Sequence, residues 1–487
     1  MLRPKLKLLE TSTVERVVDE AIQLLWEPGV QVHHEEALTL LGDAGSTIDR
    51  ANKVAHIPAE LAYKALETAP KSFHLYNAAG EPTVHYGDDD VHFDPGSAAI
   101  VFLDYETGEA RAPKTADFVQ YVKLADSLLA MDAVSTALVC SDVPQGMADL
   151  YRLYLVLRYS DKPIVTGAFA VETWATMHEM LATVAGGSEA LAEKPRAVFD
   201  VCPSPPLLWS EITCANLIDC ARAGVPAELV SMPLAGATGP ATLIGSVVQH
   251  AAESLSGIVI HQLAKAGSPI VWGGSPAVFD MRAGTTPMGA IETMMIDAAY
   301  AQVGKHLEIP THAYMALSDS KLPDAQAGLE TGIGAVIAAL AGINMVSGPG
   351  MLAFESAFSL EKLVIDAEIT EMARRMIRGV DDSEEPLALD LIRQVGHAGD
   401  FLRTRHTRSK FRQEQYIPSP VIDRNDLDSW KKAGATDAVQ RAHEVVEQKI
   451  AGYQPKELPG DALRTLEEIT LRAAQTNGLE RLPPLNE

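Results

Sequence analysis

Aromatic and acidic side chains recur in the turns that follow short apolar segments in the middle of the chain. The carboxylates are Asp104, Asp319 and Glu355, and the aromatic residues are Phe102, Tyr105, Trp209, Trp272, Tyr314, Phe354 and Phe358. A quaternary ammonium ion has no N–H to donate, so ring faces and negative charge must hold it, at about 0.5–2 kcal/mol per ring when dry. The pattern predicts a site for a permanently charged amine, with Asp319 and Glu355 as its catalytic carboxylates.

Few histidines fall in these turns, which disfavours acid–base or metal chemistry there. His312 is the histidine that lies on a predicted strand, where it either contacts the substrate or is a hydrogen-bonded core residue. Arg282 is a candidate for binding a substrate carboxylate, because a guanidinium pairs with a carboxylate through two hydrogen bonds. A surface position for Arg282 is an equally open alternative.

Two glycine-rich turns lack bulky side chains. One contains Gly236, Thr238 and Gly239, and the other contains Gly273 and Gly274. Small side chains and free amides before a helix suit an anionic group or the close approach of a wide, flat ligand. We therefore predict cofactor-binding positions here, with tight turn geometry alone as the alternative.

The elements that must position these residues repeat eight times as a strand, a turn and a helix. The predicted strands are Ala99–Leu103, Val134–Val139, Ile164–Phe169, Ala197–Val201, Glu228–Met232, Ile270–Gly273, His312–Ala316 and Ile343–Ser347. Continuous apolar runs are typical of strands covered on both faces, and eight such units predict a (β/α)8 TIM barrel of the α/β class. An open doubly wound sheet shares the alternation, but it usually carries a glycine-rich dinucleotide turn after its first strand, and none follows Leu103.

The flanks differ from this repeat. Residues 1–95 are predicted to form helices and a small β-meander, residues 96–380 the barrel, and residues 381–487 a helical extension. The meander would comprise Ser72–Tyr76, Thr83–Tyr86 and Val91–Phe93. Helices are expected in the extension at Leu387–Val395, Thr436–Gly452 and Asp461–Thr476.

Composition limits the partners. Forty basic and sixty-five acidic residues give a net charge of −25, which argues against binding to nucleic acid or anionic membranes. The segment 403–412 is basic against this background. The four cysteines lack metal or disulfide spacing, and the basic N-terminus has no apolar core of a signal peptide, so we expect a cytoplasmic protein without a bound metal.

Long ordered stretches resemble one known family, the corrinoid-dependent trimethylamine methyltransferase superfamily. They are the turn 235–240 with the helix after it, Trp272–Thr285, Ser318–Gln326 and Glu361–Gly379. The resemblance implies a (β/α)8 barrel that transfers a methyl group from a methylated amine to Co(I) cobalamin on a separate small corrinoid protein. Founding members carry pyrrolysine, whereas this chain has ordinary residues throughout. It therefore resembles the glycine betaine:corrinoid methyltransferases, whose implied donors are quaternary amines.

Rival functions stay open at this point. One is a metal-dependent barrel lyase or aldolase, and another is a betaine-binding protein without catalysis. A variant of the main hypothesis methylates tetrahydrofolate directly. A homo-oligomer is also expected.

Overall fold

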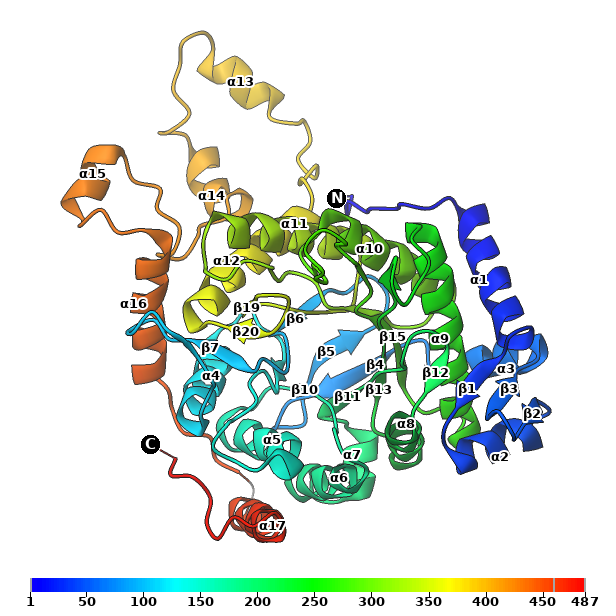
Figure 1. The fold of residues 1–487 in the computed structure, drawn as a ribbon. Helices are drawn as coiled ribbons and strands as arrows, with labels where there is room; N and C mark the ends of the chain where they lie inside the picture. The colour runs from blue at the N-terminus through cyan, green and yellow to red at the C-terminus, as the bar shows by residue number, and fades with distance from the viewer. Residues whose placement is uncertain (1, 459, 486–487) are drawn as a thin grey trace.

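Eight parallel strands close into a barrel in the computed structural model, which describes residues 2–458 and 460–485 (Figure 1). The strands are β6 (His92–Asp94), β9 (Val134–Ser135), β10 (Ile164–Thr166), β11 (Ala197–Val201), β13 (Ala227–Ser231), β15 (Ile270–Gly274), β17 (His312–Ala313) and β18 (Met345–Ser347). Strands β9 to β15 pair in parallel, as do β17, β18 and β6. A Trp272–Thr311 bridge joins β15 to the segment leading into β17, and the amide of Asp132 donates to Phe93 O at 2.8 Å to close the ring. The predicted TIM barrel is confirmed.

The first barrel strand is not the one that the sequence indicated. Val101–Leu103 forms β7 in a separate four-stranded sheet over the barrel mouth, and β6 takes the first place in the barrel. The other members of this mouth sheet are β8 (Ala110–Arg111), β19 (Met351–Leu352) and β20 (Ala357–Phe358). An apolar run indicates that a strand is buried, but it does not identify the sheet to which the strand belongs.

Helices surround the barrel. They are α4 (Thr115–Ser127), α5 (Ala148–Tyr159), α6 (Val171–Ala185), α7 (Ser188–Glu193), α8 (Glu211–Ala223), α9 (Leu243–Ala264), α10 (Ile291–His306), α11 (Ala325–Ala341) and α12 (Leu360–Ile377), with a short 3₁₀ turn at Gln145–Met147. The side chains of Ser210, Asp324 and Ser359 accept amide hydrogen bonds and start α8, α11 and α12. Helix α9 is long and apolar enough to span a membrane by composition, but 78% of its apolar window is buried within the protein.

A hairpin closes the N-terminal end of the barrel. Strands β4 (Phe73–Tyr76) and β5 (Pro82–Tyr86) pair with each other, while the third predicted meander strand joins the barrel as β6. The plug is made by apolar hairpin residues that pack against the lowest inward-facing residues of the barrel, namely Leu75, Val84 and Tyr86 against Val165, Val198, Val271 and Met345. Because this end is filled, we expect the site at the opposite end of the barrel, where the strands have their C-terminal ends.

The N-terminal layer covers one side of the barrel. Helices α1 (Thr11–Trp26), α2 (Glu35–Asp43) and α3 (Ala59–Thr68) pack on α9. A four-stranded sheet lies with them, in the order β12 (Leu208–Trp209), β1 (Val30–Val32), β3 (Val54–His56) and β2 (Thr47–Asp49). The short strands β14 (Leu234–Ala235) and β16 (Ala277–Val278) pair in the loops that follow β13 and β15.

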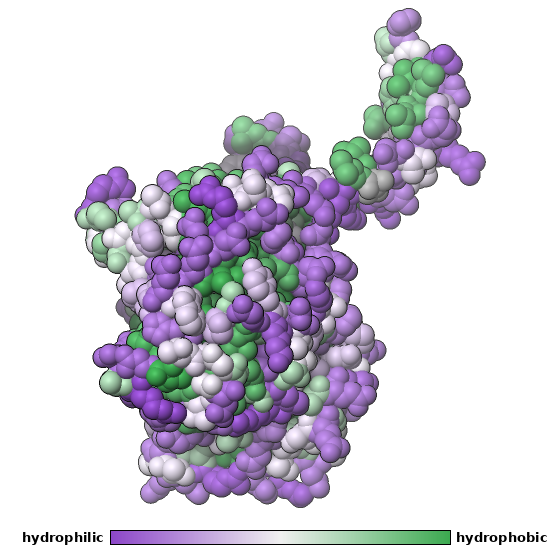
Figure 2. All heavy atoms as spheres, turned by 90° about the vertical axis from the view of Figure 1, so that its right-hand side faces the viewer, coloured by the Kyte–Doolittle hydropathy of each residue, from purple (hydrophilic) through white to green (hydrophobic). Residues whose placement is uncertain are grey.

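The C-terminal extension has two parts. Helices α16 (Ala438–Ala451) and α17 (Ala462–Thr476) pack on the barrel helices, whereas α13 (Leu389–Val395), α14 (Arg405–Glu414) and α15 (Leu427–Lys432) bury no residues. The chain carrying α13 projects away from the body (Figures 1 and 2). The three predicted helices correspond to α13, α16 and α17.

Candidate active site

The interior of the barrel is polar at mid-height. Asp200 pairs in register with Glu228, and Ser347 pairs with Asp94, so these side chains share the inward face of their strands. His312 and Tyr314 enter from β17 and the turn after it. We call the set the barrel centre; it comprises Asp94, Asp200, Glu228, His312, Tyr314, Ser347 and, from a mouth loop, Glu355, whose charge acts on Tyr314 and is acted on by Asp200 and Asp94.

Hydrogen bonds cross the barrel centre. The hydroxyl of Tyr314 donates to Asp200 Oδ2 at 2.7 Å and lies 2.9 Å from Ser97 Oγ. Ser347 Oγ donates to Asp94 Oδ1 at 2.6 Å and lies 3.0 Å from His312 Nε2. From the hairpin plug, Tyr86 donates to Glu228 Oε2 at 3.3 Å. The network thus ties strands on opposite sides of the barrel together.

Burial dominates the electrostatics of the barrel centre. It raises the pKa of Asp200 to about 6 and holds the pKa values of Asp94, Glu228 and Glu355 well above the ordinary range for carboxyls. It also lowers the pKa of His312 to about 3, so this imidazole is neutral near pH 7. A cation placed among these carboxyl groups would therefore stabilise their ionised forms.

Three of the four acids have one oxygen without a partner among the described residues. Asp94 Oδ2, Asp200 Oδ1 and Glu355 Oε1 are buried and form no hydrogen bond with the described residues, whereas Glu228 Oε1 lies 3.3 Å from His312 Nδ1. Native proteins rarely leave buried polar atoms unsatisfied, and each such atom calls for an explanation. A bound cation would supply the missing electrostatic partner.

Left-handed backbone conformations concentrate around this centre. Ala353, Phe354 and Glu355 have φ values of 50°, 60° and 64°, and Ala98 and Ala316, in the turns after β6 and β17, have 70° and 59°. A left-handed residue other than glycine costs about 1–2 kcal/mol. Such strain gathers at functional sites, where the surrounding structure holds it in place.

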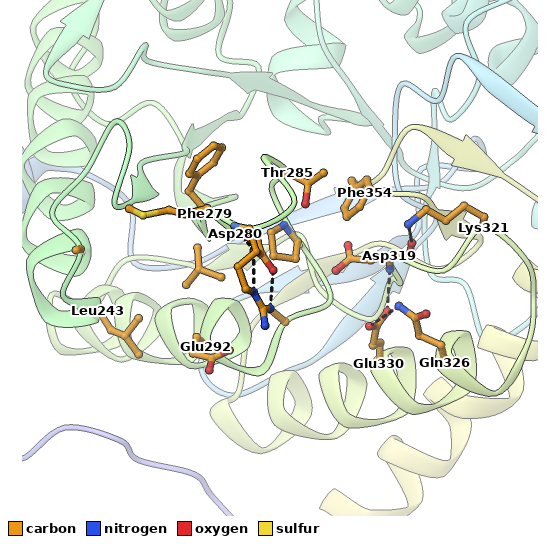
Figure 3. A pocket seen from close by; sticks show the side chains of 16 residues that line it. Leu243, Phe279, Asp280, Thr285, Glu292, Asp319, Lys321, Gln326, Glu330 and Phe354 are labelled. Atoms are coloured by element: carbon orange, nitrogen blue, oxygen red, sulfur yellow. Dashed lines mark hydrogen bonds and ion pairs between the residues drawn. The ribbon is translucent and has the colours of Figure 1, made fainter.

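A cavity of about 840 Å³, here called the mouth pocket, opens at the C-terminal ends of β15, β17 and β18 (Figure 3). Phe279, Asp280, Asp319, Lys321 and Phe354 are among its lining residues. Phe354 lines this pocket while the next residue, Glu355, belongs to the barrel centre, so the two sites share one strained turn.

Asp319 organises the loops of the mouth pocket. Its two oxygens accept the amides of Met288 at 2.9 Å and Gly289 at 3.0 Å, and burial raises its pKa to about 6. Lys321 Nζ donates to Asp319 O and lies 4.2 Å from the centroid of the Phe354 ring. The predicted residues Asp319 and Phe354 therefore lie together, as do Glu355, His312 and Tyr314 deeper in the barrel.

Arg282 lies on the rim of the mouth pocket rather than inside it. Its side chain is 91% exposed and pairs with Asp280 at 2.8 Å. A guanidinium already neutralised and this far in water is poorly suited to bind a buried carboxylate. Arg282 thus lies at the mouth, but its exposed and paired side chain does not favour the expected contact with a substrate carboxylate.

Phe102, Asp104 and Tyr105 lie elsewhere, which corrects the expectation that they share the site. They line a separate cavity against α16, where Asp104 pairs with Arg111 at 2.9 Å. The ring of Tyr105 stacks on His443 with 3.7 Å between centroids. The cause is the displaced strand, since β7 belongs to the mouth sheet and not to the barrel.

Trp209 and Trp272 are core residues, which corrects their predicted place in a cation cage. Both are fully buried, and their indole N–H groups donate to Ser256 Oγ at 2.8 Å and to Tyr300 O at 3.0 Å, respectively. Trp272 is in register with Leu229 and therefore faces the surrounding helices, one residue out of phase with the interior.

The first glycine-rich turn forms hydrogen bonds within itself. The amide of Gly236 (φ 93°) donates to Gly239 O, and the amide of Gly239 donates to Leu234 O. Thr238 Oγ1 accepts the amide of Leu234 at 3.0 Å, and α9 begins only at Leu243. The free amides expected for cofactor binding are therefore already used within the turn.

Gly273 and Gly274 make room for histidines. A Cβ at Gly273 would lie 2.9 Å from His312 Nδ1, and one at Gly274 would lie 2.5 Å from His250 Nε2. These glycines therefore allow close packing on both faces of β15, and the structure does not place them against a ligand cavity.

Sequence reasoning missed Asp94, Asp200, Glu228 and Ser97. A signal existed for two of them, because Asp200 and Glu228 fall inside predicted strands that are otherwise apolar. A carboxyl group in a strand covered on both faces must lie in the barrel interior or under a helix, and either position demands a reason. In the part of the chain that the structure describes, no group of three or more His, Cys, Asp or Glu side chains could hold a metal ion.

A closed parallel barrel with a plugged base, a strained mouth and a buried polar centre defines a TIM-barrel enzyme. Residues 2–478 match the family model described as trimethylamine methyltransferase (MTTB). The chain therefore belongs to the trimethylamine methyltransferase family and is a methyltransferase.

Named relatives span nearly the whole chain. The trimethylamine methyltransferase of Desulfitobacterium hafniense (strain DSM 10664 / DCB-2) is 30% identical over 94% of this chain and 92% of its own length. The glycine betaine methyltransferase of D. hafniense (strain Y51) is 32% identical over 94% and 95%. Among solved structures, the monomethylamine methyltransferase of Methanosarcina barkeri superposes with a TM-score of 0.53, at 11% identity over 93% of this chain and 90% of that one, which shows a shared fold.

Proposed function

We propose that this enzyme transfers a methyl group from a quaternary amine, glycine betaine or a related betaine, to Co(I) of a corrinoid carried by a separate protein. One observation carries the proposal. The barrel centre holds four buried carboxyl groups, three of which have an oxygen that lacks a partner among the described residues, and a neutral histidine 3.3 Å from the fourth. The likeness to a relative named glycine betaine methyltransferase supports the same substrate class.

A permanently charged nitrogen fits this centre better than a tertiary amine does. A quaternary nitrogen can offer no hydrogen bond, so it depends on carboxylate charge in a low-dielectric interior and on a ring such as that of Tyr314. A tertiary amine would enter neutral or need a proton. The barrel centre therefore favours the donor that carries its charge at every pH.

The mouth pocket suits the methyl acceptor. Its volume of about 840 Å³ exceeds what a small amine needs, and Phe279, Lys321 and Phe354 would face a large, flat ligand there. A corrinoid supplies reduced cobalt, a nucleophile strong enough to take a methyl group without acid catalysis. The residues of the mouth pocket would hold its ring, and the small corrinoid protein would dock around the rim.

The chain's own residues would act by alignment and by excluding water. The carbon–nitrogen bond breaks, its electron pair stays on nitrogen, and a neutral tertiary amine leaves. No proton is transferred to or from the amine, which agrees with a centre whose histidine does not titrate near neutral pH. The carboxylates must not bind the cation too tightly, because its charge disappears in the reaction.

The test mixes the enzyme with Co(I) cobalamin and, separately, glycine betaine, proline betaine, carnitine or trimethylamine. We expect Co(I) to be consumed only with a quaternary amine, and mass spectrometry to detect the demethylated amine. Turnover of trimethylamine but of no quaternary amine would refute the proposal. So would the absence of turnover with every amine tested. Binding of glycine betaine without turnover would indicate a binding protein, and bound metal with lyase activity the other rival.

Tetrahydrofolate replaces Co(I) cobalamin in a parallel assay. Demethylation with this acceptor alone would show direct transfer and remove the corrinoid from the proposal. The cytoplasmic location and the lack of nucleic-acid or membrane partners stay predictions from the sequence.

A further inference from the structure

Arg152 on α5 is a buried cation without a matching anion. It is 1% exposed, its Nε donates to Ala148 O at 3.2 Å, and its Nη1 donates to Thr136 O at 2.8 Å. It forms no ion pair with any residue that the structure describes, and its Nη2 donates no hydrogen bond to them. Burying an unpaired charge is costly, so a missing partner is expected.

The nearest acid is already engaged. Asp149 Oδ2 accepts the amide of Phe169 at 2.8 Å and the hydroxyl of Thr173 at 2.5 Å, while Oδ1 accepts the amide of Leu150 at 2.8 Å. Asp149 therefore fixes the turn after β10 instead of pairing with the guanidinium. In a chain with sixty-five acidic residues, an arginine left unpaired in the interior is conspicuous.

Arg152 lies at the end of the barrel where the substrate must enter. It contacts Thr136 in the turn after β9, and its guanidinium lies 5.0 Å from the ring centroid of Phe169 in the turn after β10. Cys140 and Tyr314 are close enough to act on its charge. Tyr314 reaches from the end of β17 to Asp200, where its hydroxyl donates at 2.7 Å, so one side chain adjoins both the acidic centre and Arg152.

We infer that Arg152 binds the carboxylate of the same substrate whose quaternary nitrogen lies among Asp200 and Glu355. A zwitterion would place its positive end in the acidic centre and its negative end on the free side of the guanidinium. The inference rests on the proposed function and narrows it from quaternary amines in general to betaines. It also gives Arg152 the contact that the sequence suggested for Arg282.

The experiment crosses variants with substrates. Arg152→Gln should raise the KM for glycine betaine by about 10- to 100-fold, the value of a hydrogen bond to a charged group. It should leave the KM for tetramethylammonium, which has no carboxylate, nearly unchanged. Arg472→Gln is the matched control and should leave both KM values unchanged, because its guanidinium is exposed, pairs with Glu179 at 2.8 Å and lies on α17, away from the mouth pocket.

A second measurement needs no variant, in case Arg152→Gln does not fold. Wild-type enzyme should prefer glycine betaine over its methyl ester, which lacks the negative charge, by a similar factor in kcat/KM. Equal losses on both substrates in the variant, or no wild-type preference over the ester, would overturn the inference. Failure of wild-type enzyme with every quaternary amine would instead overturn the proposed function.

A second, independent observation concerns residues 380–416, which we call the arm. Its large apolar side chains are in solvent, namely Val380, Leu387, Leu389, Ile392, Phe401, Leu402 and Phe411, at 39–79% exposure. Figure 2 shows them as apolar patches on a projection that stands clear of the body. A protruding segment of this kind is typical of a surface that a partner covers.

We infer that the arm packs on a second copy of this chain. Its segment 403–412 carries five basic and no acidic residues, while the chain as a whole carries −25, so another copy offers the opposite charge. Helix α11 offers an apolar face, since Leu329 is 65% and Ile333 is 47% exposed. An exchange of arms between two copies would cover both surfaces symmetrically.

Sedimentation velocity tests this inference. Wild-type protein should sediment as a dimer or a multiple of it, Leu389→Glu/Ile392→Glu should sediment as a monomer, and Leu129→Glu should behave as wild type. Leu129 is the control because it is 93% exposed and lies outside the arm. A monomeric wild-type protein at micromolar concentration would refute the inference. It would do so even if the arm were then found to bind the corrinoid protein.

Discussion

Asp200 and Glu228 are neighbours across two parallel strands, and neither carboxyl group can ionise cheaply beside the other. Burial raises the pKa of both, and Tyr314 and Tyr86 each donate one hydrogen bond to the pair. Paired buried carboxyls of this kind hold protons until a cation arrives. We therefore predict that substrate binding is coupled to proton release from the Asp200 and Glu228 pair.

The first prediction concerns pH. Asp200 has a pKa of about 6, so it is protonated below that pH and charged above it. The KM for glycine betaine should fall about tenfold between pH 5 and pH 7, since a permanent cation binds the charged form better. Steady-state kinetics measures it, and a KM that is flat or that rises over this range would contradict it.

A second prediction concerns stability. A carboxyl whose pKa is raised by folding stabilises the protein below its unfolded pKa, and that contribution is lost as the pH rises through about 6. Asp200→Asn removes this loss, so the variant should be more stable than wild type at pH 8 by about 1–3 kcal/mol and should lose activity. Denaturant unfolding at pH 5 and pH 8 checks it, and a variant less stable than wild type at pH 8 would argue against it.

At the scale of elements, the turn between β19 and β20 sets where Glu355 lies. The amide of Ala353 donates to Ser320 O at 2.8 Å, and Gly350 N donates to Asp366 Oδ2 at 2.7 Å, so two loops and α12 hold the turn in its left-handed form. Lys362 in turn pairs with Asp366 at 2.5 Å. The strain is therefore maintained by neighbours that are themselves buried.

Ala353→Gly tests the turn. Glycine adopts a positive φ without steric cost, so the variant should gain up to about 1 kcal/mol of stability while kcat falls, because Glu355 is less firmly held. Ala435→Gly, at φ 54° in the C-terminal extension, is the control and should change stability alone. Thermal unfolding and kcat measure the two effects; an unchanged kcat would mean that the strain does not position Glu355.

At the scale of the molecule, one hydrophobic core runs from α1 through the barrel to α17. Val14, Trp272 and Leu466 all belong to it. The N-terminal layer and helices α16 and α17 are thus parts of the same packed unit. The arm and α15 contribute no buried residue to it, and the hairpin plug forms a separate apolar cluster at the base of the barrel.

The shared core predicts a single unfolding transition. Leu466 on α17 is fully buried, so Leu466→Ala should cost about 2–5 kcal/mol. The melting temperature should drop equally by tryptophan fluorescence, which senses the distant Trp209 and Trp272, and by circular dichroism. Two separate transitions would show that the C-terminal helices unfold independently.

The sequence by itself determined the barrel, since eight apolar runs separated by helical segments leave few other architectures. It also determined that Glu355, Tyr314 and Asp319 fall in loops or strand ends at the mouth. The tertiary structure decided which strand opens the barrel and which side chains face inward. Because side chains alternate along a strand, a prediction that is wrong by one residue exchanges the inward and outward faces, and Trp272 in fact faces the helix layer. Phe102 lies in another cavity because its strand belongs to the mouth sheet. The assembly of Asp94, Asp200 and Glu228 in one interior depends on contacts between distant segments, which no local pattern encodes.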